Sequence, residues 1–174
     1  MEYARDLATE MQSEGKGKVL DQFSNLDNPQ AHIEATGPEI WTQTQGQVTR
    51  FVSAMGATGT IMGVFTYLKS RNAAVQVIGA QPAEGSQVLG IRKWPEAYLP
   101  AIFDPKLVDA YESIDQAQAE QMARRLAAEK GVFAGISSAG ALLAALRVAE
   151  RVKNSTIMFH RVRSRRSLSF YRRF

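Results

Sequence analysis

The sequence contains no cysteine and only two histidines, His32 and His160. Without cysteine the chain can form neither a disulfide nor a thiolate metal site, and neither histidine has neighbours at metal-ligand spacing. The chain also has no apolar run of the about 18 residues that a membrane-spanning helix requires. Residues 1–6 lack the basic and then apolar pattern of a signal peptide. We therefore expect a soluble, cytoplasmic protein with no metal ion and no membrane partner.

Positive charge is concentrated at one end of the chain. Residues 160–174 hold six arginines and no acidic residue, although the whole sequence carries a net charge of only +4. The other 15 basic residues lie in 1–159 together with all 17 acidic residues, so that part is slightly acidic. A polybasic tail is typical of segments that bind nucleic acids or membrane surfaces. With 45% hydrophobic residues in 174, the chain can bury one core but is short for a two-domain enzyme.

Strand-like and helix-like segments alternate along the chain, which predicts an α/β fold with a mostly parallel sheet flanked by helices. Residues 82–106 are predicted to form a long functional loop. Strands are predicted at 19–23, 50–55, 75–80, 108–114 (as an edge strand) and 132–136. Helices are predicted from 4 to about 14, from 30 to about 44 with a bend at Gly37-Pro38, after residue 60, from 116 to 130 behind an Asp115 cap, and after 138 with Leu142, Ala145, Leu146 and Ala149 buried.

The first candidate site is a glycine-containing loop predicted to join a strand to a helix. Its residues are Gly56, Ala57, Thr58, Gly59 and Thr60. A helix N-terminus offers unpaired N–H groups and a positive dipole end, which together favour a phosphate. The loop lacks the lysine of a P-loop and the glycine spacing of a dinucleotide site. A tight turn capped by threonine explains the same residues, so both interpretations stay open.

Two further segments carry polar residues in predicted loops. In residues 135–140, Ser138 is either a helix N-cap or, with Ser137, a hydroxyl at the carboxyl end of the sheet, where ligands of α/β folds bind. No acid–base pair accompanies it, so a hydrolase is not supported. In residues 90–95, Arg92 and Lys93 could attract an anion beside Trp94. A solvated basic turn with the tryptophan packed on the surface is the alternative.

Taken together, these segments resemble the O-acetylserine sulfhydrylases, the cysteine synthases that use pyridoxal 5'-phosphate and have the tryptophan-synthase-β fold (fold type II). Residues 20–23, 27–29 and 36–41 extend the similarity. Residues 90–95 and 98–100 point to the B type of this family. The similarity covers residues 1–159.

The resemblance implies a division of the chain and a role for each site. Residues 1–45 would be a remnant of the smaller domain with its linker, and 46–159 an incomplete cofactor-side domain. Residues 56–60 would hold the cofactor phosphate through backbone amides and two threonine hydroxyls, and Ser137 would bind the pyridine nitrogen. Gly90, Ile91 and Arg92 would lie near the substrate. The implied reaction is β-replacement of O-acetylserine with sulfide or thiosulfate, giving L-cysteine or S-sulfocysteine, in a homodimer.

Several positions depart from the family pattern. The family's Schiff-base lysine lies upstream of the matching segment, so no catalytic residue is assigned and the isolated chain is expected to be inactive. Ala57 replaces a threonine, and Ala139 replaces a glycine, which would crowd the ring or strain the turn. From residue 160 onward the similarity stops. Because one inserted nucleotide would convert the family's codons into this tail, our hypothesis is a disordered frameshift product that binds no nucleic acid.

Two alternatives remain at this stage. One is a sibling pyridoxal-phosphate lyase of the threonine dehydratase or cystathionine β-synthase type, against which residues 90–95 argue. The other is a non-catalytic fragment that pairs with an intact subunit or with a separate N-terminal piece. Apolar faces left without their partner strands would then promote aggregation.

Overall fold

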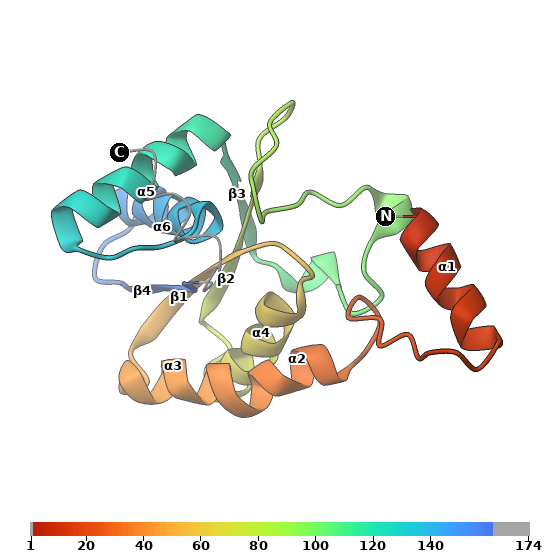
Figure 1. Cartoon of the computed structure of the whole chain (residues 1–174). Helices are drawn as coiled ribbons and strands as arrows, with labels where there is room; N and C mark the ends of the chain where they lie inside the picture. The colour runs from red at the N-terminus through yellow and green to blue at the C-terminus, as the bar shows by residue number, and fades with distance from the viewer. Residues whose placement is uncertain (1, 162–174) are drawn as a thin grey trace.

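The computed structural model describes residues 2–161, so the predicted disordered tail 160–174 lies outside them from residue 162 onward. The described chain forms an α/β fold with helices on both sides of one sheet (Figure 1). In chain order its elements are α1 (Glu2–Ser13), α2 (Asp27–Ala31), the π-helical turn η1 (His32–Thr36), α3 (Gly37–Gln43), β1 (Val48–Ala54), α4 (Gly59–Arg71), β2 (Gln76–Pro82), the 3-10 turns η2 (Glu96–Tyr98) and η3 (Pro105–Leu107), β3 (Ala110–Ile114), α5 (Gln116–Lys130), α6 (Ile136–Glu150) and β4 (Thr156–Phe159).

The sheet has four strands in the order β3-β2-β1-β4, and every neighbouring pair is parallel. This confirms the predicted fold class and the edge position of β3. Strand β4 was not predicted, because four residues are too few to give a clear alternating pattern. It pairs with β1 in parallel and brings the chain back to the carboxyl edge of the sheet.

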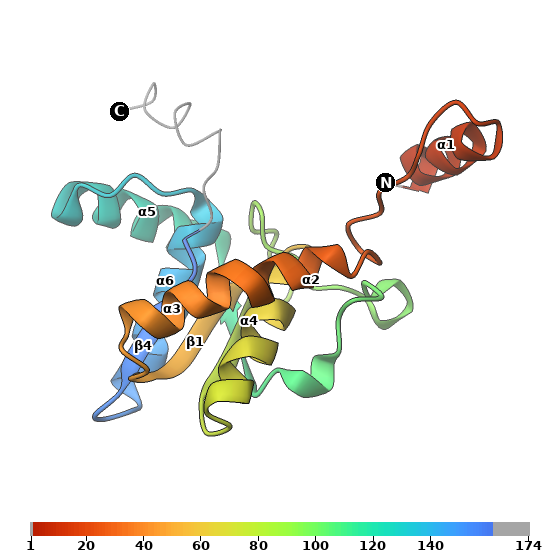
Figure 2. The same ribbon diagram turned by 90° about the horizontal axis from the view of Figure 1, so that it is seen from below.

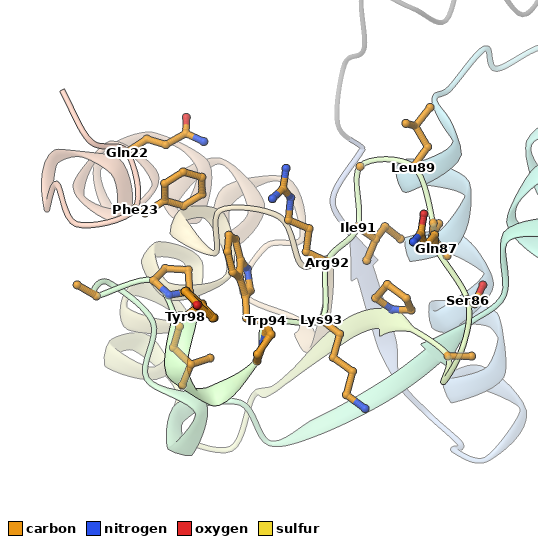
Figure 3. A pocket seen from close by; sticks show the side chains of 18 of the residues that line it. Gln22, Phe23, Ser86, Gln87, Leu89, Ile91, Arg92, Lys93, Trp94 and Tyr98 are labelled. Carbon is orange, nitrogen blue, oxygen red and sulfur yellow. The ribbon is translucent and has the colours of Figure 1, made fainter. Parts of the chain in front are cut away.

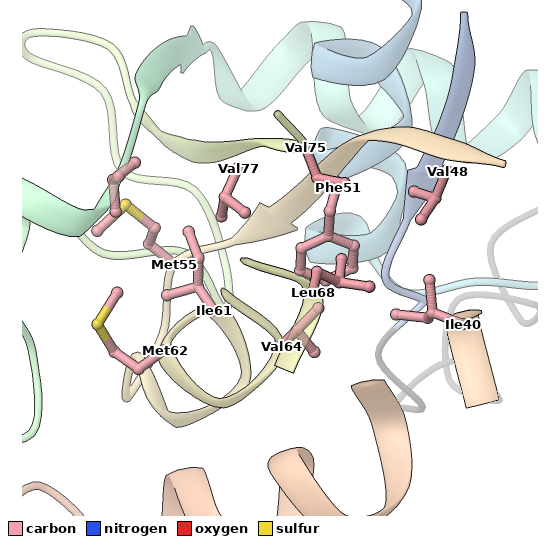
Figure 4. Packing of buried hydrophobic residues seen from close by; sticks show 11 residues of the cluster. Ile40, Val48, Phe51, Met55, Ile61, Met62, Val64, Leu68, Val75 and Val77 are labelled. Carbon is pink, nitrogen blue, oxygen red and sulfur yellow. The ribbon is translucent and has the colours of Figure 1, made fainter. Parts of the chain in front are cut away.

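Alternate side chains of the central strands fill two cores, one on each face of the sheet. Phe51 and Val77 pack toward α4 in the cluster shown in Figure 4. Val52 and Ile78 pack instead with α6 residues such as Ala144. Helices α2 and α3 cover α4, and α5 packs beside α6. The sheet is therefore buried on both faces, as expected for parallel strands.

Two predicted strands are wrong. Residues 19–23 form no strand: Asp21, at φ 34°, accepts hydrogen bonds from the Phe23 amide and the Ser24 hydroxyl, which makes a polar turn. Residues 132–135 form an irregular link between α5 and α6. Gly131, at φ 64°, ends α5 there, and the link leads directly into α6 without joining the sheet.

Two predicted helices differ in detail from the observed ones. The segment 30–44 is divided into α2, η1 and α3. The π turn ends at Thr36, two residues before Pro38, whose missing N–H removes a helical hydrogen bond. In α6 most of the buried residues are small, among them Ala139, Ala141 and Ala144, whereas Leu146 is 42% exposed. Small residues predominate because α6 lies between the sheet and α5. Helix α1 stands away from the rest of the described chain, as Figure 2 shows.

Candidate functional site

The loop between β1 and α4 packs closely against the segment that contains Asn28. Thr58 adopts the left-handed conformation, with φ 69°, and Gly59 begins the helix. A Cβ atom placed on Gly59 would lie 1.9 Å from the Asn28 side-chain oxygen, so only glycine fits there. Asn28 is itself fixed, because its amide donates to Gln22 O at 2.7 Å. The backbone of the predicted phosphate loop is therefore fixed before any ligand binds.

The amides of residues 56–60 are available to a ligand. Among the described residues, none of these five amides donates one of the backbone hydrogen bonds made outside helices and strands. The first bond in the helical pattern comes from the Met62 amide to Thr58 O at 3.1 Å. Helix α4 has 13 residues, so its N-terminus adds a positive dipole end to these donors.

The two threonine hydroxyls of the loop have different partners. Thr58 is buried, and its hydroxyl donates to Ala57 O at 2.6 Å. The Thr60 hydroxyl lies 3.1 Å from His32 Nε2. Ala57 contributes no hydroxyl. In this structure the loop thus presents amides, and Thr60 is the loop threonine whose hydroxyl is not turned onto the loop's own backbone.

The other two candidate segments, 135–140 and 90–95, meet beside the loop 56–60 through Ser137 and Gly90. Ser137 is buried in the first turn of α6. Gly90 has φ 83°, and a Cβ on it would lie 3.1 Å from the Ser137 Cβ. On its other side, Gly90 O lies 3.7 Å from where a Cβ on Gly56 would be. Gly90 therefore lies between the predicted phosphate loop and the serine.

The α6 N-terminus differs from the sequence prediction in one respect. The residue that caps α6 is Gly135, so the expectation that Ser138 is the N-cap is wrong. Ser138 lies inside the helix and is fully buried. Ala139 is also helical and packs against Met122 and Ala123 of α5. Its methyl group is accommodated in that contact, in an ordinary helical segment.

The long loop 82–106 is hydrogen-bonded directly to the end of β1 and to the predicted phosphate loop. The Arg92 amide donates to Met55 O at 2.6 Å, and Trp94 Nε1 donates to Gly56 O at 2.8 Å. The Trp94 ring packs edge-on against Phe23, with ring centroids 5.4 Å apart. The Arg92 guanidinium lies 5.3 Å from the Trp94 ring centroid. Trp94 is therefore part of the site, which differs from the alternative of an isolated surface turn.

A cavity of about 1900 Å³ opens beside this loop. It is lined by residues from 82–95 and 98–101 on one side and from 19–24 on the other. Figure 3 shows that the Arg92 side chain extends toward Gln22, whereas Lys93 points away in the opposite direction. Arg92 is thus the basic residue placed to meet an anion on that side of the cavity.

A histidine pair lies next to Thr60 and was not predicted as part of the site. The rings of His32 and His160 lie 6.4 Å apart and nearly perpendicular. Burial lowers the pKa of His32, and burial together with the charge of His32 lowers the pKa of His160. His32 also contacts Thr36, four residues further on, at 2.8 Å. That i, i+4 spacing of two polar residues on one helix face is the signal in the sequence that could have identified them.

These residues fit the pyridoxal phosphate that the resemblance implies. A phosphate needs hydrogen-bond donors, which the amides of 56–60 supply at a helix N-terminus. A pyridine nitrogen needs one donor, which the Ser137 hydroxyl can supply. Within residues 2–161 no group of three or more His, Asp or Glu residues is placed to hold a metal ion. In the same residues every helix is too short or too polar to span a bilayer.

Comparisons with known proteins agree with this geometry. Residues 1–160 match the family described as pyridoxal-phosphate dependent enzyme. The chain is 56% identical to cysteine synthase B of Pseudomonas aeruginosa and 52% identical to that of Escherichia coli K12, over 91% of this chain in both cases. The chain spans about half the length of these relatives, 53% and 52% respectively.

Solved structures show the same fold. A cysteine synthase from Entamoeba histolytica superposes with a TM-score of 0.82 at 31% identity, over 95% of this chain and 52% of that one. An O-ureido-L-serine synthase superposes with a TM-score of 0.80 at 30% identity, over 89% of this chain and 52% of that one. The fold is therefore that of the tryptophan-synthase-β-like enzymes, and the chain belongs to the family of pyridoxal-phosphate-dependent enzymes.

Proposed function

We propose that the site binds pyridoxal phosphate, with the phosphate at residues 56–60 and the pyridine nitrogen at Ser137. The observation that carries the proposal is the convergence of three distant segments. Gly90 lies between Gly56 and Ser137 and is close to both. The hydrogen bond from Trp94 Nε1 to Gly56 O holds the loop that contains Gly90 in place. Gly90 has φ 83° and packs against the buried Ser137, so a side chain at position 90 would crowd the serine.

We further propose that the whole protein is a cysteine synthase of the B type. It would replace the acetate of O-acetylserine with sulfide or thiosulfate, and it would act as a homodimer. The identity of 51–56% to three proteins named cysteine synthase B supports this activity. When bound, the cofactor supplies an electron sink for the bonds at the substrate's α-carbon.

The residues of this chain would bind and orient the reactants. The amides at the start of α4 would neutralise the phosphate charge. Ser137 is neutral, so its hydroxyl would orient the ring without keeping the ring nitrogen protonated. Arg92, held over the Trp94 ring, would bind the anionic sulfur donor in the cavity.

The 174-residue polypeptide alone is expected to form no cysteine. None of its lysines lies at a position that matches the family's Schiff-base lysine; they are Lys16, Lys18, Lys69, Lys93, Lys106, Lys130 and Lys153. Lys69, for example, lies in the last turn of α4, at the opposite end of the helix from the loop, and is paired with Asp109 at 3.1 Å. Purified chain mixed with O-acetylserine and sulfide should give no product. Addition of the N-terminal half of the Pseudomonas aeruginosa relative should restore turnover, and turnover without it would contradict the proposal.

The cofactor site itself is tested by restoring a hydroxyl. Ala57→Thr should tighten pyridoxal phosphate binding by about tenfold or more, the effect of one added hydrogen bond to a charged group. Ser137→Ala should weaken it by removing the donor to the ring nitrogen. Binding can be followed by quenching of the fluorescence of Trp94 and Trp41. Equal affinity of all three proteins would show that the cofactor does not bind at these residues.

A further inference from the structure

His32 lies beside the proposed phosphate site and contacts a threonine hydroxyl with each of its ring nitrogens. Nδ1 lies 2.8 Å from Thr36 Oγ1, and Nε2 lies 3.1 Å from Thr60 Oγ1. Burial lowers the pKa of His32 below its usual value of 6.5, so the ring is neutral at neutral pH and carries a single N–H hydrogen. One of the two threonines must therefore donate to the ring while the other accepts from it.

In the π-helical turn η1, the Thr36 hydroxyl hydrogen-bonds to the His32 ring. In an ordinary helix a threonine can donate to the carbonyl four residues earlier, which here is the carbonyl of His32. In η1 that carbonyl accepts from the amide of Gly37, five residues along the chain, so the register here is that of a π-helix. The Thr36 hydroxyl instead meets His32 Nδ1 at 2.8 Å. Single π turns often occur at functional sites, and this one orients a side chain toward the phosphate loop.

Helix α4 holds His32 against Thr60 through a glycine contact. A Cβ on Gly63 would lie 2.3 Å from Pro29 O and 2.6 Å from His32 Cβ, so any larger residue would push the two helices apart. The His160 ring packs edge-on against His32. The close approach of the two helices thus fixes where the His32 side chain starts, and the His160 ring packs on its imidazole.

We propose that His32 carries its hydrogen on Nε2, so that Thr36, His32 and Thr60 form one directed chain of hydrogen bonds that ends at a phosphate on residues 56–60. The Thr36 hydroxyl donates to Nδ1, Nε2–H donates to Thr60 Oγ1, and the Thr60 hydroxyl donates to the phosphate. In the reverse arrangement the Thr60 hydroxyl donates to Nε2. Only the lone pairs of its oxygen then face the phosphate, and they repel the negative charge. The bound anion therefore selects the first arrangement.

This inference rests on the proposed phosphate site, and it makes His32 and Thr36 positioning residues for Thr60. Nitrogen chemical shifts of the His32 ring distinguish the two tautomers and should be recorded for the 174-residue chain, alone and with saturating inorganic phosphate. The expected result is hydrogen on Nε2 in the phosphate-bound protein. Phosphate affinity should fall about fivefold in Thr36→Val, the effect of one lost hydrogen bond. Thr36→Ser should restore it.

Thr42→Val is the matched control, because Thr42 is an exposed threonine of the neighbouring helix α3. It should bind phosphate as the unchanged chain does. Hydrogen on Nδ1 in the phosphate-bound protein, or unchanged affinity in Thr36→Val, would overturn the relay while leaving the phosphate site itself intact. Hydrogen on Nε2 in a chain that binds no phosphate would support the orientation of His32 and would refute the proposed function.

Discussion

Replacing Gly63 by alanine tests how closely α4 must approach the segment that carries His32. The added methyl group would meet a backbone oxygen, Pro29 O, at 2.3 Å, and neither helix can rotate a side chain to avoid it. Alanine gains about 1 kcal/mol over glycine from helix propensity. Overpacking costs about 1–3 kcal/mol, and a backbone clash at this distance lies at the upper end of that range. We expect the free energy of unfolding of Gly63→Ala to fall by about 2 kcal/mol.

Gly140→Ala is the matched control in helix α6. There the added methyl group would meet the end of the flexible Ile91 side chain at 2.8 Å, which can move at little cost. The same propensity gain should leave this variant within about 1 kcal/mol of the unchanged chain. Urea unfolding followed by circular dichroism gives both values. The reasoning is refuted if Gly63→Ala is as stable as Gly140→Ala with the same dependence on urea.

Three further predictions concern the histidines, a helix cap and the tryptophan. Burial lowers the pKa of His32 and His160 in the folded chain, so the unfolded chain binds more protons as the pH falls through 6.5. Stability should therefore be full above pH 6.5 and decline below it; if replacing both histidines by glutamine leaves that decline unchanged, the explanation fails. Asp115→Ala should lower the free energy of unfolding by about 1 kcal/mol, because the Asp115 carboxylate accepts from two amides at the start of α5, whereas Asp115→Asn should keep most of it. Trp94→Phe should weaken pyridoxal phosphate binding with little loss of stability, because it removes the hydrogen bond to Gly56 O but keeps an aromatic ring at this position. The fluorescence of bound cofactor measures the affinity, and an unchanged affinity would show that this hydrogen bond does not shape the loop 56–60.

Local chemistry predicted the parts of the fold that depend on neighbouring residues. The Asp115 cap, the end of α5 at Gly131 and the βα loop at 56–60 all follow from residue types at fixed offsets. The wrong strand at 19–23 follows from the same rules, because Leu20 and Phe23 gave an apolar pattern. Leu20 is 72% exposed, and the hydrogen bonds of Asp21 decide the local structure.

The assembly of the candidate site could not be predicted from local chemistry. The contact of Gly90 with Ser137 joins residues 47 positions apart and depends on the path of the long loop. Likewise, His32 meets Thr60 only because Gly63 lets α4 and η1 approach. Strand β4 forms because β1 offers it a free edge, which four residues of sequence do not reveal.

The central claim is that the amides of residues 56–60 hold the phosphate of pyridoxal phosphate. Titration of the isotopically labelled chain with pyridoxal phosphate, followed by amide nitrogen and proton shifts, tests it most directly. The account predicts saturable shifts that are largest at residues 56–60 and that extend to Ser137. It also predicts that inorganic phosphate shifts the amides of 56–60 and leaves Ser137 nearly unchanged. Saturable binding whose largest shifts lie elsewhere in the described chain, or no saturable binding at all, would contradict it.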